Sequence, residues 1–139
     1  MTHERKSGYL SVLAAHGVES VVLTGLATRS FGRFMAARLK ADYADVDGVL
    51  CFNDQVALGV LSACAEHGPR VGQKLKVIGI DDIEDCRDSF PSLTSVSCNI
   101  SDLANAAATS LLSWITEGKK PAETTRLPIS LVQRSSSKG

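Results

Sequence analysis

One stretch decides the fold: Gly48-Val49-Leu50-Cys51-Phe52-Asn53-Asp54-Gln55-Val56-Ala57-Leu58-Gly59. The run over 48–52 is short, apolar and rich in strand-forming residues, which is typical of a strand buried on both faces. Over 55–66 the apolar residues recur at helical spacing, and His67-Gly68-Pro69 is a typical helix end. A buried strand followed directly by a helix is the repeating unit of an α/β fold.

The same alternation of strand and helix extends along the chain on both sides of this stretch. We expect helices over 4–15, 28–39 and 101–116, with Thr28 and Ser101 as their N-caps where they open. We expect further strands over 20–23, 76–80, 95–98 and 125–133, the last at an edge or a bend because it contains Pro128. The predicted fold is α/β, with a parallel sheet covered by helices on both faces.

Composition excludes several classes of protein. The chain has 139 residues, 44% of them hydrophobic, which is enough for the core of one domain. Lys and Arg together number 15, as do Asp and Glu, so there is no excess charge for nucleic acid or an anionic membrane. No apolar run reaches the ~18 residues of a membrane span, and the polar start lacks a signal peptide's hydrophobic region, so we expect a cytoplasmic protein.

The sequence lacks the patterns of an enzyme or a metal site. It has no GxSxG, P-loop, GxGxxG or HExxH motif, and none of its histidines lies in a catalytic context. The cysteines have no CxxC pair and no histidine at zinc-binding spacing, so we expect reduced and mostly buried thiols. We therefore predict no enzyme activity, no cofactor and no metal. The cysteines are Cys51, Cys64, Cys86 and Cys98.

Polar residues follow two of the expected strands. Asn53-Asp54 comes after the strand at 48–52, and Asp81-Asp82 comes after the strand at 76–80. In open parallel sheets, ligands bind beyond the carboxyl ends of the strands. One of Asn53 and Asp54 is expected to cap the helix that follows, Asp81-Asp82 also suits a solvated turn, and Arg5 alone is an ordinary surface arginine. Together, a carboxylate, an amide and a guanidinium would recognise sugar hydroxyls or a purine edge without doing chemistry.

Several segments, in order along nearly the whole chain, resemble those of the lactose-repressor/galactose-repressor (LacI/GalR) family. Residues 48–59 resemble its A-x-x-x-x-N-D-x-x-A-x-G segment, and residues 77–82 its V-x-G-x-D-D strand end. Residues 91–96 are similar to its P-x-L-T-T-V crossover, and residues 127–136 to its L-P-x-x-L-V-x-R-x-S terminus. Residues 5–9 match the R-x-x-G-[FY] start of a helix.

The resemblance implies a periplasmic-binding-protein-like lobe of a bacterial transcription regulator, in which two α/β lobes enclose an effector cleft. It implies that Arg5, Asn53 and Asp81 hydrogen-bond a small effector, sugar-like or purine-like. It also implies a homodimer packed through the helix at 55–66 and the region after Asp82. An exposed apolar face on that helix would be consistent with such a homodimer. Ala27 departs from the family pattern, which has an effector-stacking aromatic residue at that position.

By the same resemblance, residues 1–139 form the C-terminal part of the effector-binding and dimerisation domain. The helix-turn-helix and most of the first lobe are then absent from this sequence, and operator DNA is bound only through that missing part. The family also has a parallel, interior strand just before the helix that contains Arg5, where this chain has only residues 1–4. We therefore expect unpaired strand edges, exposed apolar faces and low stability of the monomer.

Two alternatives from other classes remain open. One is a lobe of a periplasmic-type sugar-binding protein, which shares the fold and the N-D and G-x-D motifs. The P-x-L-T and L-P-x-x-L-V-x-R elements and the lack of a signal peptide favour the regulators over it. The other is a receiver-like module with Asp81, Asp82 and Glu84 around a divalent cation. The order of acidic residues along the chain does not fit a receiver.

Overall fold

The sheet is formed by β1 (Gly48–Leu50), β2 (Lys76–Asp81), β3 (Thr94–Ser97) and β4 (Ser130–Val132), in the order β1-β2-β3-β4. The computed structural model describes residues 3–138. β1, β2 and β3 are parallel, as predicted, whereas β4 runs antiparallel to β3. The predicted α/β class is confirmed, and β4 lies at the edge that Pro128 indicated.

The helices are α1 (His3–Ala15), α2 (Arg29–Asp42), α3 (Asp54–His67), α4 (Asp85–Asp88) and α5 (Ile100–Glu117). Thr28 caps α2, since its hydroxyl accepts a hydrogen bond from the Phe31 N–H at 3.2 Å. Gly118, with φ of 68°, ends α5 in the left-handed conformation that suits glycine. The prediction that Ser101 is the N-cap of α5 is wrong, because α5 begins at Ile100 and Asn99 occupies the N-cap position.

The core is centred on α3, which packs between α2 and the sheet. Gly32 of α2 and Gly59 of α3 bring the two helix backbones together. A Cβ added at Gly32 would lie 2.1 Å from the Val56 carbonyl oxygen, and one at Gly59 would lie 2.1 Å from the Arg29 carbonyl oxygen. All the large apolar residues of α3 are buried, so this helix does not present the exposed apolar face that would be consistent with a homodimer packed through it. Its exposed positions are Ser62, Ala65, Glu66 and His67.

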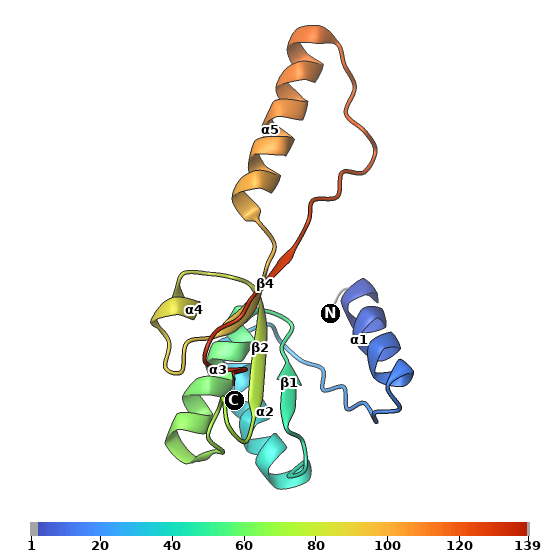
Figure 1. Ribbon diagram of the computed structural model, residues 1–139. Helices are drawn as coiled ribbons and strands as arrows, with labels where there is room; N and C mark the ends of the chain where they lie inside the picture. Colours follow the sequence, from blue (N-terminus) through green and yellow to red (C-terminus); the bar gives the residue numbers. More distant parts are fainter. Residues whose placement is uncertain (1–2, 139) are drawn as a thin grey trace.

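The predicted strand over 20–23 is wrong. Residues 18–26 form no strand, and they connect α1 to α2 on the far side of a gap from β1 (Figure 1). A strand exists only through its ladder of hydrogen bonds with a neighbour. The β-branched run at 20–23 has no such neighbour among residues 3–138, so its strand propensity is not expressed.

α1 and α5 stand away from the sheet. Neither helix has a buried residue, and Figure 1 shows α5 projecting from the body of the molecule. Apolar side chains are exposed along α5, including those of Leu111, Leu112, Trp114 and Ile115. The exposed apolar surface of the described residues therefore includes a large part of α5. Within residues 3–138, no helix combines the length and the apolar character that crossing a membrane requires.

Candidate functional site

Arg5 connects α1 to the edge of the sheet at which β1 and β2 end, here called the carboxyl edge. Its Nη1 donates a hydrogen bond of 2.9 Å to the Phe52 carbonyl oxygen, and its guanidinium carbon lies 5.0 Å from the centroid of the Phe52 ring. Its Nη2 lies 4.0 Å from Oδ1 of Asp81. The side chains of Arg5 and Asp81 are 34% and 37% exposed, so water screens this pair and a ligand could reach it.

Asp81 and Asp82 turn the chain sharply at the end of β2. Both have positive φ, 117° and 57°, a region that Asp tolerates better than most residues. Such backbone strain is concentrated at functional sites, where surrounding contacts enforce it. Here the contacts belong to Asp82: its N–H donates to the Ser95 hydroxyl at 3.1 Å, and its carboxylate pairs with Arg134 at 2.7 Å. Asp82 is thus fixed in the fold, while Asp81 is left at the carboxyl edge.

Partial burial raises the pKa of Asp81 above its ordinary value. The nearby positive charge of Arg5 acts in the opposite direction, and the negative charge of Asp54 adds to the rise. Arg5 is thus the group that favours the ionised form of Asp81 at this edge. A ligand with hydroxyl groups would meet a carboxylate acceptor beside a guanidinium donor.

Asn53 is the N-cap of α3, as predicted for one residue of the Asn53-Asp54 pair. Its side-chain oxygen accepts a hydrogen bond from the Val56 N–H at 3.0 Å, and its Nδ2 donates to the Ala27 carbonyl oxygen at 3.4 Å. The structure therefore brings Arg5 and Asp81 together, whereas the Asn53 amide holds α3 and the loop before α2. One amide hydrogen remains for a ligand.

Asp54 has a structural role that the sequence pattern did not reveal. It is 1% exposed, and it accepts hydrogen bonds from the Ser95 hydroxyl at 2.6 Å and from the Ile83 N–H at 3.0 Å. A Cβ at Gly79 would lie 2.0 Å from its Oδ1, so glycine is needed there to admit the carboxylate. Buried polar groups with their partners satisfied are part of the core rather than of a binding site.

The acidic residues near this edge do not form a cation site. Asp82 is paired with Nη2 of Arg134, and Nη1 of the same guanidinium donates to the Leu93 carbonyl oxygen at 2.7 Å. Glu84 is exposed. Among residues 3–138, no cluster of His, Cys, Asp and Glu is arranged to hold a metal ion. This arrangement gives no support to a receiver-like module.

Phe52 is the contact that sequence reasoning missed at this edge. Its carbonyl and its ring both contact Arg5, so the residue before Asn53 sets the position of the guanidinium. The sequence could have indicated this contact through the position of Phe52, which directly precedes the Asn53-Asp54 pair. Cation–π contact with a partly exposed arginine contributes about 0.5–1 kcal/mol.

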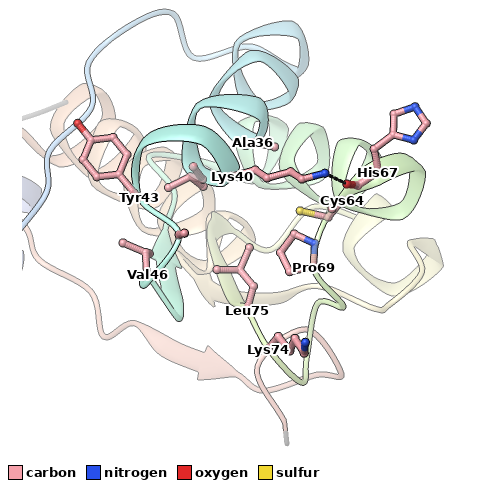
Figure 2. Close-up of a pocket in the computed structure, with 12 residues that line it drawn as sticks. Ala36, Lys40, Tyr43, Val46, Cys64, His67, Pro69, Lys74 and Leu75 are labelled. Carbon is pink, nitrogen blue, oxygen red and sulfur yellow. Dashed lines mark hydrogen bonds between the residues drawn. The ribbon is translucent and has the colours of Figure 1, made fainter.

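A cavity within the described residues ends at this site, and a second, smaller one lies away from it. The larger, of about 670 Å³, runs along β1 and reaches Arg5 and Phe52. The smaller, of about 310 Å³, lies at the other end of the strands, among Ala36, Tyr43, Cys64 and Leu75 (Figure 2). In Figure 2 the ammonium group of Lys40 points to the His67 carbonyl oxygen, to which it donates at 3.0 Å. The carboxyl edge, where the oppositely charged side chains of Arg5 and Asp81 lie together and partly exposed, is the better candidate for ligand binding.

Comparison with known sequences places the chain among transcription regulators. The family described as periplasmic binding protein-like domain matches residues 1–137. The HTH-type transcriptional regulator IdnR of Escherichia coli is 32% identical over 115 residues, which are 81% of this chain and 34% of that protein. The ribose operon repressor of Bacillus subtilis is 29% identical over 132 residues, which are 94% of this chain and 40% of the repressor. The chain thus spans less than half the length of these relatives, which are named as a transcription regulator and a repressor.

Solved structures give the same result. A LacI family regulator from Enterococcus faecium with bound ribose superposes with a TM-score of 0.88 at 27% identity, over 98% of this chain and 51% of its own. The lac repressor dimer bound to operator and an anti-inducer superposes with a TM-score of 0.86 at 27% identity, over 97% of this chain and 41% of its own. The chain therefore belongs to the periplasmic binding protein-like family, within the LacI-type regulators that its motifs resemble.

Proposed function

We propose that this chain is the effector-sensing part of a bacterial transcription regulator of the repressor type, and that its effector is a sugar or a related metabolite. One observation carries the proposal: the partly exposed side chains of Arg5 and Asp81 lie 4.0 Å apart at the carboxyl edge. This is the edge at which open parallel sheets bind ligands. The bound ribose of the Enterococcus faecium regulator supports the sugar class.

Each residue of the proposed site has a distinct role. Asp81 accepts hydrogen bonds from adjacent hydroxyls, and Arg5 donates to ring or hydroxyl oxygens. Asn53 adds its remaining amide hydrogen, and Phe52 positions Arg5 through the stacked ring and the carbonyl bond. Binding by these groups orders the edge without any bond being broken, as a sensor requires.

In the whole regulator, effector binding shifts the population between two arrangements of the effector-binding lobes and so alters the affinity for operator DNA. Residues 1–139 are the C-terminal part of the effector-binding and dimerisation domain in this proposal, and the protein acts in the cytoplasm as a homodimer. The chain by itself does not bind operator DNA, because its net charge is zero and no reading helix is expected in it. Retardation of labelled operator DNA by this chain at moderate salt would contradict that part.

The binding proposal is tested by titrating the chain with ribose, galactose, lactose and hypoxanthine in turn and mapping the NMR chemical-shift changes. The same titrations are repeated on the variants Asp81→Asn, Arg5→Gln and Asp88→Asn. Asp88 is an exposed carboxylate on α4, so its variant controls for loss of one negative charge. We expect one ligand class to change the chemical shifts of residues at the carboxyl edge. The affinity for that ligand should fall by about tenfold or more in Asp81→Asn and Arg5→Gln, and it should be unchanged in Asp88→Asn. Equal binding by the chain and Asp81→Asn overturns the site.

Sedimentation equilibrium of the unmodified chain tests the homodimer. The lac repressor structure among the neighbours is a dimer, which supports this part of the proposal. A mass that stays monomeric at high micromolar concentration would contradict it.

A further inference from the structure

The backbone, rather than the contact with Arg5, holds Asp81 at the carboxyl edge. The 4.0 Å between Arg5 Nη2 and Asp81 Oδ1 exceeds the length of a hydrogen bond, so this contact does not fix the carboxylate. The φ of 117° at Asp81 lies outside the left-handed region of roughly 50–70° that non-glycine residues enter. A backbone in such a conformation persists only where the contacts around it enforce it. The position of the Asp81 carboxylate therefore depends on contacts made by its neighbours.

The next residue along the chain, Asp82, makes these contacts. It has a φ of 57°, and its N–H donates to the Ser95 hydroxyl at 3.1 Å. Its Oδ1 accepts a hydrogen bond of 2.7 Å from Nη2 of Arg134. The side chains of Asp82 and Arg134 are only 13% and 12% exposed, so water and salt screen this ion pair less than the pair of Arg5 and Asp81. Asp82 is therefore the well-anchored half of the turn after β2.

Arg134 is itself anchored to β3 and to the residue before it. Its Nη1 donates to the Leu93 carbonyl oxygen at 2.7 Å, and its backbone N–H donates to the Thr94 hydroxyl at 2.7 Å. One guanidinium thus connects the buried Leu93 to Asp82 by two diverging bonds, which a lysine ammonium cannot reproduce in the same geometry. Within residues 3–138, Arg134 forms an ion pair with Asp82 and not with Asp81. Any effect of Arg134 on Asp81 therefore passes through Asp82.

We propose that Arg134 is a positioning residue for the proposed effector site. Through Asp82 it holds the turn after β2 in the conformation that leaves the Asp81 carboxylate beside Arg5, where that carboxylate accepts hydrogen bonds from a ligand. This inference rests on the proposed function and adds to it a residue that does not touch the ligand. Without Arg134 the turn adopts ordinary conformations for part of the time. The affinity for the ligand then falls in proportion to the fraction of time in which Asp81 is correctly placed.

The backbone conformation of Asp81 is measured by the three-bond NMR coupling between its amide and α hydrogens. This coupling is small at a φ of 117° and large at the φ of about −120° that is typical of a strand. We expect a small coupling in the unmodified chain and a larger one in Arg134→Gln, because the released turn averages over both conformations. Arg134→Gln leaves the sequence of the turn unchanged. A large coupling in the unmodified chain, or an unchanged one in folded Arg134→Gln, overturns the proposal.

A second variant separates positioning from a general loss of stability. Ser136→Ala removes a buried hydroxyl from the same C-terminal segment, where it donates to the Val77 carbonyl oxygen at 2.6 Å and accepts from the Thr94 N–H at 2.8 Å. This variant should unfold more easily and leave the Asp81 coupling unchanged, and an equal change of the coupling in both variants overturns the proposal. Far-ultraviolet circular dichroism and a cooperative thermal transition establish folding. If Arg134→Gln is not folded, Arg134→Lys replaces it, with a smaller increase of the coupling expected and an unchanged coupling again overturning the proposal.

A titration and a binding measurement give independent readouts. Arg5→Gln should raise the pKa of Asp81 in the unmodified chain and raise it less in Arg134→Gln, because the released carboxylate no longer stays beside Arg5. The affinity for a ligand that binds at the carboxyl edge should fall about fivefold in Arg134→Gln if Asp81 is correctly placed for about a fifth of the time, and less than about twofold in Ser136→Ala. An equal rise of the pKa in both backgrounds, or an undiminished affinity, overturns the proposal. If none of the sugars or hypoxanthine binds, the proposed function fails, while the coupling still decides whether Arg134 positions Asp81.

Discussion

The carboxylate of Asp54 accepts a 2.6 Å hydrogen bond from the hydroxyl of Ser95, inside the core and 41 positions away in the sequence. This contact joins the first turn of α3 to β3. The second oxygen of the same carboxylate accepts from the Ile83 N–H just after β2. Asp54 thus ties together the elements whose ends form the proposed effector site.

Asp54→Ala is expected to lower the free energy of unfolding by about 3 kcal/mol, because it leaves the Ser95 hydroxyl and the Ile83 N–H buried without an acceptor. Urea unfolding followed by circular dichroism measures the change. Asp88→Ala, which removes an exposed carboxylate from α4, should change the same quantity by less than about 0.5 kcal/mol. Similar losses in the two variants would show that the Asp54 contacts contribute little.

Because α2 and α3 approach each other closely, replacing a helix glycine by alanine is expected to lower the free energy of unfolding here, whereas it normally raises it. Alanine is normally the better helix residue by about 1 kcal/mol, yet Gly59→Ala places a methyl group 2.1 Å from the Arg29 carbonyl oxygen. Overpacking of this kind costs about 1–3 kcal/mol, so we expect the free energy of unfolding to fall. Gly8→Ala in α1 has nothing within 4 Å of the new methyl group and should instead increase helicity. A more stable Gly59→Ala chain would mean that α2 and α3 separate readily.

The raised pKa of Asp81 predicts a pH dependence with a definite sign. Because burial raises the pKa of this carboxyl in the folded chain, its ionisation opposes folding at neutral pH. That penalty disappears as the pH falls below the unfolded value of about 4, where both states are protonated. Asp81→Asn should therefore be more stable than the unmodified chain at pH 7 and equally stable near pH 3, as measured by urea unfolding at each pH.

Arg5 provides the matching test of the electrostatics. Its positive charge lowers the pKa of Asp81, so Arg5→Gln should raise that pKa further, as followed by NMR titration of the Asp81 carboxyl carbon. Arg126→Gln removes an exposed charge that faces Glu4 instead, and it should leave the Asp81 titration unchanged. An unaltered pKa in Arg5→Gln would show that the two side chains do not interact in solution.

The thiols should differ in reactivity according to their burial. Burial raises the pKa of Cys51 and of Cys86 to about 12, so neither forms thiolate at pH 8. All of the cysteines are free, and Cys98 alone among them is not fully buried. Iodoacetamide at pH 8 should modify Cys98 first, with the other cysteines modified at a similar rate only in urea. Mass spectrometry of the digested protein gives the order, and early modification of Cys86 in the folded chain would contradict it.

Local patterns were sufficient for β1, α3 and their junction. The apolar run, the helical spacing and the cap at Asn53 all lie within a few residues of one another, and the structure confirms them. The strand predicted over 20–23 failed because its formation depends on a partner that is remote in sequence. β-propensity describes how a residue fits a pleated surface, and it cannot create that surface.

The adjacent acidic residues Asp81 and Asp82 also show how far prediction from local sequence extends. Asp81 and Asp82 are indistinguishable by local pattern, but within residues 3–138 Arg134, which is 52 positions from Asp82, forms an ion pair with Asp82 and not with Asp81. In the same way Ser95 decides that Asp54 belongs to the core. Sequence alone therefore located the edge at which polar groups gather, and contacts distant in sequence decided which of them stay exposed there.

The protruding α5 is attached to the sheet at a single row of residues. The chain leaves from Ser97 at the end of β3 and returns at Ser130 at the start of β4, and these two residues pair with each other. Ser97 also pairs with Asp81 on its other side. Both connections to α5 therefore start and end in the row of the sheet that contains Asp81. The protruding segment and the proposed effector site share one end of the sheet, so a substitution in this row can alter the support of both.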